Sequence, residues 1–135
     1  MMRILKNNKG FSELVCSLVG LLIITCMLVI SLTFIKIVNH QTVLNEFGNQ
    51  MIETVCDYGK TSGVEISDRF GQLEDSLQIS PDISYDSSYL TGSKVQYGEV
   101  ITITISSEAD INILGFDRTM EFEITKTGRS KYYWK

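Results

Sequence analysis

The stretch LVCSLVGLLIITCMLVISLTFI, from Leu14 to Ile35, contains no charged residue. As a helix rising about 1.5 Å per residue it would extend roughly 33 Å, against a bilayer hydrocarbon core of about 30 Å. A cleaved secretory signal has a shorter apolar core of about 7–15 residues, followed by a cleavage site with small residues. The segment after this apolar run, KIVNHQTVL, contains no alanine. We therefore expect a retained, single-pass transmembrane helix over residues 11–35.

The charges on the two sides of the apolar run differ. Those before it are all basic: Arg3, Lys6 and Lys9. From Lys36 onward the chain has nine basic and fifteen acidic residues. Because basic flanks of a membrane helix stay on the cytoplasmic side, we expect the basic leader, residues 1–10, inside the cytoplasmic membrane and residues 36–135 outside it. An acidic outer part without a basic stripe argues against nucleic acid as a partner.

Helical periodicity continues beyond the apolar run. Apolar residues recur at spacings of three and four: Leu44, Phe47, Met51, Val55 and Tyr58. This spacing is typical of an amphipathic helix, and no proline or turn cluster separates it from the run. We therefore predict one helix from about Phe11 to Tyr58. Gly48 lies in its interior, where glycine costs about 1 kcal/mol relative to alanine.

A second, shorter helix is expected after the glycine-containing break Gly59–Gly63. Ser62 and Glu65 have the spacing of a capping box, in which each side chain satisfies a backbone N–H of the first helical turn. Its buried stripe would contain four apolar residues: Ile66, Phe70, Leu73 and Leu77. The helix should end before Pro81, because the residue before a proline is driven away from helical backbone angles.

After Pro81 the apolar period changes from 3.6 to 2, which predicts strands. We expect a short strand at Ile83–Tyr85 and a clear one around EVITITIS, followed by a second clear strand around Met120–Ile124. In the first clear strand, Ile101, Ile103 and Ile105 are expected to point to the same face of the sheet. Ile111 and Ile113 continue this alternation, and they either extend the strand or form another strand after a bulge. Turns are predicted at Gly115–Asp117 and Thr127–Ser130. Tyr132–Trp134 would be a closing strand or, alternatively, a binding patch.

These elements predict an α+β fold. The long N-terminal helix has a transmembrane first half. The short second helix packs on an antiparallel sheet of three or four strands. About 95 residues outside the membrane are enough for a domain of modest stability.

The sequence contains few residues or motifs that indicate catalysis or ligand binding. It has no phosphate-binding glycine loop, no GxSxG and no HExxH. The acidic pairs Glu108/Asp110 and Glu121/Glu123 are expected on a solvated face, with a weak calcium site or paired catalytic acids as alternatives that would need a cleft. The single histidine, His40, has no metal partner at ligand spacing and is expected on a solvated helix surface. We therefore expect no catalytic activity, no metal site and no cofactor.

The cysteines do not form a framework of disulfides. Cys16 and Cys26 lie in the apolar run, where they act as small apolar residues. Cys56 is alone outside it, so the outer domain must be held together by its hydrophobic core.

Glu13 stands at the entrance of the apolar run, where a carboxylate is costly: about 2–3 kcal/mol at the bilayer centre and less near the surface. One interpretation is that it lies at the cytoplasmic interface and reaches water. The other is functional. If the chain were cut after Gly10, Phe11 would gain a free ammonium group, and Glu13 could pair with the ammonium of a neighbouring subunit during assembly.

The basic leader, Gly10, Phe11, the early Glu13 and the long apolar helix together resemble the class III signal of type IV pilins and pseudopilins. In that family a membrane peptidase cuts after the glycine. The usual pattern, G-F-T-L-x-E, places the acid fifth after the cut; here, in G-F-S-E-L-V, Glu13 is third and Val15 is fifth. This variant, together with GEVITITISS and the closing EFEITKTGRSKYYWK, resembles TadE-like pseudopilins of tight-adherence (Flp-type) pilus systems.

The resemblance implies a non-enzymatic minor pilin or pseudopilin in a type IV pilus or a related secretion or conjugation machine. Its partners would be membrane lipid, a prepilin peptidase and other pilin subunits. Close contact between anchor helices would use the small residues of the run, although ordinary membrane-helix composition explains them equally well: Cys16, Ser17, Gly20, Thr25, Cys26 and Ser31. The alternatives are a single-pass extracellular binding module that does not polymerise, and a competence-like or type II secretion-like pseudopilin.

Overall fold

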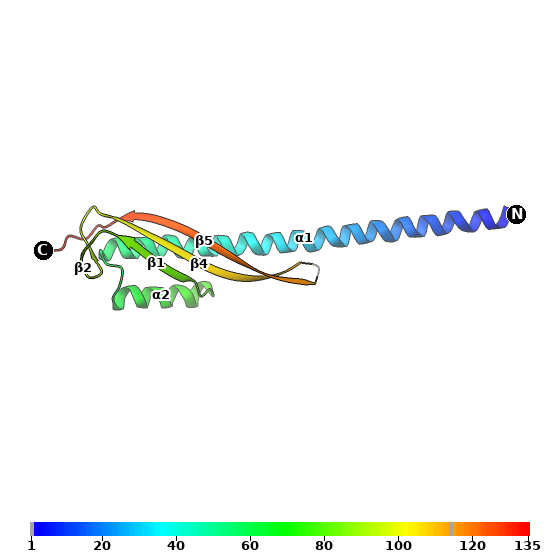
Figure 1. Cartoon of the computed structure of the whole chain (residues 1–135). Helices are drawn as coiled ribbons and strands as arrows, with labels where there is room; N and C mark the ends of the chain where they lie inside the picture. Colours follow the sequence, from blue (N-terminus) through cyan, green and yellow to red (C-terminus); the bar gives the residue numbers. More distant parts are fainter. Residues whose placement is uncertain (1, 114) are drawn as a thin grey trace. The chain divides into compact units, whose positions relative to one another are not determined.

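The structure is a computed structural model and describes residues 2–113 and 115–135. Its helices are α1 (Met2–Tyr58) and α2 (Val64–Leu77) (Figure 1). Its strands are β1 (Asp82–Ser87), β2 (Tyr89–Thr91), β3 (Lys94–Val95), β4 (Val100–Ile113) and β5 (Phe116–Arg129). Strands β1, β4 and β5 form an antiparallel sheet in the order β1-β4-β5, and β2 pairs with β3. The expected α+β class is confirmed.

The chain divides into two compact units. The first, which we call the anchor unit, contains the chain up to Ile37 together with Ile111–Arg118. The second, the head unit, contains Val38–Asp110 and Thr119–Lys135. Helix α1 and the β4–β5 hairpin therefore contribute residues to both units. Helix α1 ends at Tyr58 as predicted, and it begins earlier than predicted because no proline interrupts the leader.

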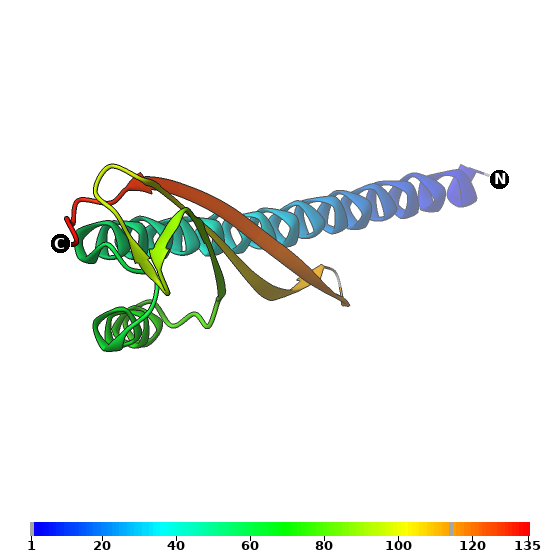
Figure 2. The same ribbon diagram turned by 60° about the vertical axis from the view of Figure 1, so that its left-hand side comes forward.

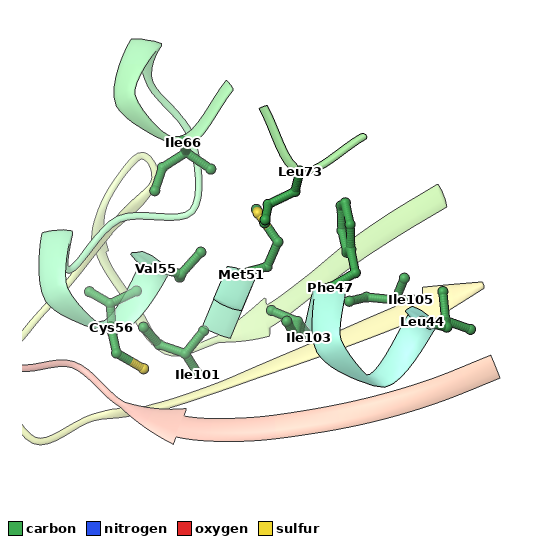
Figure 3. Packing of buried hydrophobic residues seen from close by; sticks show 11 residues of the cluster. Leu44, Phe47, Met51, Val55, Cys56, Ile66, Leu73, Ile101, Ile103 and Ile105 are labelled. Carbon is green, nitrogen blue, oxygen red and sulfur yellow. The ribbon is translucent and has the colours of Figure 1, made fainter. Parts of the chain in front are cut away.

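The hydrophobic core of the head unit lies between α1, α2 and the sheet. Figures 1 and 2 both show α2 and the three-stranded sheet alongside the second half of α1. The predicted stripe of α1 is fully buried at Leu44, Phe47, Met51 and Val55. It meets Ile66 and Leu73 from α2 and three isoleucines from β4, which are Ile101, Ile103 and Ile105 (Figure 3). The helical period of 3.6 and the strand period of 2 thus build two complementary apolar faces.

Helix α2 is confirmed, but its predicted capping box is wrong. The N-cap is Gly63, with no hydrogen bond from a side chain. The carboxylate of Glu65 instead accepts a hydrogen bond from Lys60 Nζ at 2.7 Å, and this bond lowers the pKa of Glu65. The ammonium group of Lys60, rather than the backbone N–H of Ser62, is therefore the main partner of the Glu65 carboxylate.

The sheet is more regular than predicted. The first clear strand continues through Ile113 as β4, and β1 pairs with it in a register that sets Ile83 opposite Ile105. The predicted turn at Gly115–Asp117 is shorter, because Phe116 and Asp117 already belong to β5. The β2–β3 hairpin was not predicted from the sequence.

The predicted turn at Thr127–Ser130 is wrong, because β5 runs on to Arg129. Gly128 does not turn the chain there. A Cβ built on Gly128 would lie 2.5 Å from Cys56 Sγ, and one built on Gly48 would lie 2.7 Å from Ile124 Cδ1. These two glycines permit close approach of α1 and β5, so Gly48 has a packing role that its helix propensity does not reveal.

The closing strand predicted at Tyr132–Trp134 is absent from the described residues, because side chains hold this segment in an irregular conformation. Trp134 Nε1 donates to the Gly59 carbonyl at 3.0 Å, and Trp134 N donates to Gln96 Oε1 at 2.9 Å. Lys131 adds an ion pair with Asp57 at 2.7 Å, which raises the pKa of Lys131. The C-terminal segment is thus attached to the end of α1 in the head unit.

Candidate functional site

The apolar run within α1 is the most unusual surface of the chain. Its side chains are exposed around the helix; for example, Leu21 is 66% exposed, Met27 66% and Phe34 65%. In its most apolar window of 18 residues only 6% is buried, unlike the core helix of a soluble protein. So large an apolar surface is unfavourable in water and favourable in lipid. The run is compatible with a single-pass membrane anchor; a signal sequence near the N-terminus meets the same criteria of length and composition.

Three hydroxyl side chains of the run, those of Thr25, Ser31 and Thr33, are satisfied inside the helix. The hydroxyl groups of Thr25 and Ser31 each donate to the backbone carbonyl four residues earlier, at 2.8 Å. Thr33 Oγ1 donates to the Val29 carbonyl at 3.0 Å. Because a hydroxyl without a partner is costly in hydrocarbon, these bonds make the run suitable for lipid despite its polar residues.

The candidate processing and assembly residues lie together on the N-terminal part of α1. Gly10, Phe11 and Glu13 are helical and exposed, with Phe11 71% exposed. A Cβ built on Gly10 would have no neighbour within 4 Å. Among the side chains that the structure describes, no cation lies within ion-pair distance of Glu13. The Phe11 side chain and the Glu13 carboxylate are therefore both open to a partner.

Glu108 and Asp110, which were expected to act as a pair, have different surroundings in the structure. Glu108 and Glu121 line an open polar hollow of about 220 Å³ with Asp82, whereas Asp110 accepts a hydrogen bond from Thr119 Oγ1 at 2.7 Å. In residues 2–113 and 115–135 no group of three His, Cys, Asp or Glu side chains has a geometry that could hold a metal ion. The hollow is open to solvent, which leaves its carboxylates hydrated.

His40 does not lie on a simply solvated surface, as the sequence suggested. Its ring packs against Phe122 of β5 at a centroid distance of 5.0 Å, and its Nε2 is buried without a hydrogen-bond partner within the described part of the chain. The prediction failed because β5 covers this face of α1, a contact between residues far apart in sequence.

An open, mostly apolar groove of about 290 Å³ lies between α2 and β1 in the head unit. It is lined by Thr61, Ser62, Gly63, Ile66, Ser67, Phe70, Ile83 and Tyr85. Burial, with a smaller effect of Tyr89, raises the pKa of Tyr85 to about 12, so its phenol stays a neutral hydrogen-bond donor. Sequence reasoning missed this groove because its lining comes from two stretches of sequence, residues 61–70 and 83–85, which only the fold brings together.

Cys56 is the thiol of the head unit and is 3% exposed. Burial raises the pKa of its thiol, and the nearby Lys131 only partly offsets this effect. A buried, protonated thiol is a poor nucleophile, so Cys56 acts as a small core residue against Gly128.

The family model described as "Domain of unknown function (DUF4320)" matches residues 21–135. No curated protein and no solved structure matches the chain. The matched region begins at Leu21, within the apolar run, and continues through the whole head unit.

Proposed function

We propose that this chain, which belongs to the DUF4320 family of domains of unknown function, is a membrane-anchored minor pilin or pseudopilin. It would be a structural subunit of a TadE-like, tight-adherence (Flp-type) pilus or of a related secretion or conjugation machine. The head unit would lie outside the cytoplasmic membrane and the basic leader inside it. A prepilin peptidase would remove residues 1–10, and the mature chain would join other pilin subunits without catalysing a reaction.

One observation carries the proposal: α1 extends without interruption from the apolar run into the core of the head unit. Leu44, Phe47, Met51 and Val55 of the same helix are fully buried. The apolar run and the core-forming segment are thus parts of one helix, which supports retention of the run with the head unit. The family match from Leu21 onward also supports retention of much of the run with the domain.

The exposed surface of the run supports a role in assembly. Lipid covers it while the subunit is in the membrane. In a fibre, anchor helices of neighbouring subunits would cover it instead, because apolar surface withdrawn from water contributes about 25 cal/mol per Å². Glu13 would pair with the Phe11 ammonium of a neighbour, which neutralises two charges in a dry helical bundle.

Processing is tested by intact-mass measurement on membranes of cells that also express the cognate prepilin peptidase. We expect the mature chain to begin at Phe11. Gly10→Val should leave the chain uncut, and since a Cβ at Gly10 has no neighbour, this variant should fold normally. A wild-type chain that still begins at Met1 would remove the processing step from the proposal.

Assembly is tested by Glu13→Ala, which should abolish incorporation into sheared surface fibres while the amount in the membrane stays unchanged. Loss of the carboxylate leaves the neighbour's ammonium unpaired among apolar helices. The matched control is Glu53→Ala, which removes an exposed carboxylate from the same helix and should assemble normally. Equal fibre yields from the two variants would contradict the assembly role of Glu13.

The groove between α2 and β1 supports a second candidate, an anchored extracellular binding module that does not polymerise. In that case Glu13→Ala would leave function intact. Ser67→Asp, which places a charge in the groove wall at an exposed position of α2, would instead abolish binding at the cell surface. The two variants therefore separate the two candidates.

A further inference from the structure

The turn of the β4–β5 hairpin belongs to the anchor unit. Ile111–Arg118, which we call the hairpin tip, forms one compact unit with the chain up to Ile37. Thr33 Oγ1 lies 3.5 Å from the Asn112 carbonyl oxygen, and Thr33 is only 7% exposed. Thr33 stands two residues before the end of the apolar run, a rise of about 3 Å along the helix. The hairpin tip therefore lies beside the last turn of the run.

The exposed surface of the hairpin tip combines two apolar side chains, Ile113 and Phe116, with the polar side chains of Asn112, Asp117 and Arg118. Phe116 is 75% exposed and Ile113 37% exposed, and the exposed Arg118 follows on β5. The neighbouring turn of α1 is apolar and exposed, with Leu32 61% and Ile35 61% exposed. Lys36, directly after the run, is exposed and marks the boundary where charge begins.

The hairpin tip is held in shape by its own polar groups. Asn112 Nδ2 donates to Asp117 Oδ1 at 2.6 Å, and Gly115 N donates to Asn112 Oδ1 at 3.1 Å. Gly115 has φ +87°, a backbone conformation that favours glycine. Asn112 thus satisfies a backbone N–H and a carboxylate at the turn, which lowers the cost of moving the turn into a less polar environment.

We propose that the hairpin tip inserts into the headgroup region of the bilayer leaflet that adjoins the head unit, with lipid as its occupant. The inference rests on the anchor part of the proposed function. If the run spans the bilayer, its last turn lies at the membrane–water interface, and so does the hairpin tip beside it. Phe116 and Ile113 would contact the upper acyl chains, and Arg118 would reach the lipid phosphates. The apolar run and the hairpin tip would then both be held at the same membrane–water interface, which would restrict rotation of α1 about its axis.

The test uses the full chain reconstituted in vesicles of phosphatidylcholine and phosphatidylglycerol, with bromine on the phosphatidylcholine acyl chains at a shallow or a deep position. Phe116→Trp reports on the hairpin tip. Phe34→Trp reports on the run, and Tyr97→Trp is the matched exposed control. Tyr97 is 65% exposed and precedes β4, so it belongs to the head unit and not to the hairpin tip. Emission is read as the difference from the parent chain, which retains Trp134.

We expect blue-shifted emission from Phe116→Trp, with a loss of intensity that is larger for shallow than for deep bromine. Phe34→Trp should be quenched as well, and Tyr97→Trp should emit as in water without quenching. If Phe34→Trp is quenched while Phe116→Trp behaves like Tyr97→Trp, the tip contact is overturned and the anchor stands. A blue shift of Phe116→Trp without quenching would mean a protein contact, such as a second copy, and would overturn the lipid assignment. If Phe34→Trp is not quenched, the anchor fails and the tip contact fails with it.

Discussion

Replacing Phe47 by alanine is expected to lower the free energy of unfolding of the head unit by about 3–5 kcal/mol. Phe47 is fully buried on α1, and its ring meets Phe70 of α2 edge-on at a centroid distance of 5.3 Å. Removing the ring leaves a cavity at the point where the helices and the sheet meet. Since small domains have only about 5–15 kcal/mol of stability in total, the loss should be a large share of it.

The measurement is denaturant unfolding of the full chain in detergent micelles, followed by the fluorescence of Trp134 in the head unit. Tyr97→Ala is the control, because it removes an aromatic ring that is 65% exposed and should change stability by less than about 0.5 kcal/mol. A Phe47→Ala variant as stable as this control would contradict the described core.

Replacing Gly59 by alanine should lower the free energy of unfolding by about 2–5 kcal/mol, from two causes. Gly59 has φ +59°, and a left-handed conformation costs an L-residue about 1–2 kcal/mol. A Cβ there would also lie 2.6 Å from Tyr132 Cβ and 2.9 Å from Ser130 Oγ. Ser130 is buried and donates to the Val95 carbonyl at 3.0 Å, so it cannot move freely, and such overpacking costs about 1–3 kcal/mol.

The same exchange at Gly71 provides the matched control. Gly71 lies within α2, and a Cβ built there would have no neighbour within 4 Å. Gly71→Ala should therefore raise the free energy of unfolding by about 0.5–1 kcal/mol, through the higher helix propensity of alanine. Both variants are measured by the same denaturant unfolding. A Gly59→Ala variant at least as stable as the parent chain would show that the backbone at Gly59 is not constrained as described.

The sequence by itself determined the elements whose signals are local. The charge-free run predicts an anchor-length helix, the 3.6-residue period of Leu44–Val55 places one face of α1 in the core, and the alternation in Ile101–Ile105 defines the buried face of β4. Each signal repeats along neighbouring residues, and burial of one face imposes that repeat. Gly10, Phe11 and Glu13 were likewise singled out by a local motif, and their role stays a prediction.

Only the tertiary structure decided features that depend on distant partners. Gly128 looked like a turn residue, but Cys56 on α1 occupies the space of its missing side chain. His40 looked solvated, but Phe122 covers it; Glu65 looked like a cap, but Lys60 binds it. The hairpin tip reaches the end of the apolar run through a contact across 79 residues. Propensity and periodicity describe a residue's neighbours along the chain, whereas these roles are set by side chains that only folding brings within a few ångströms.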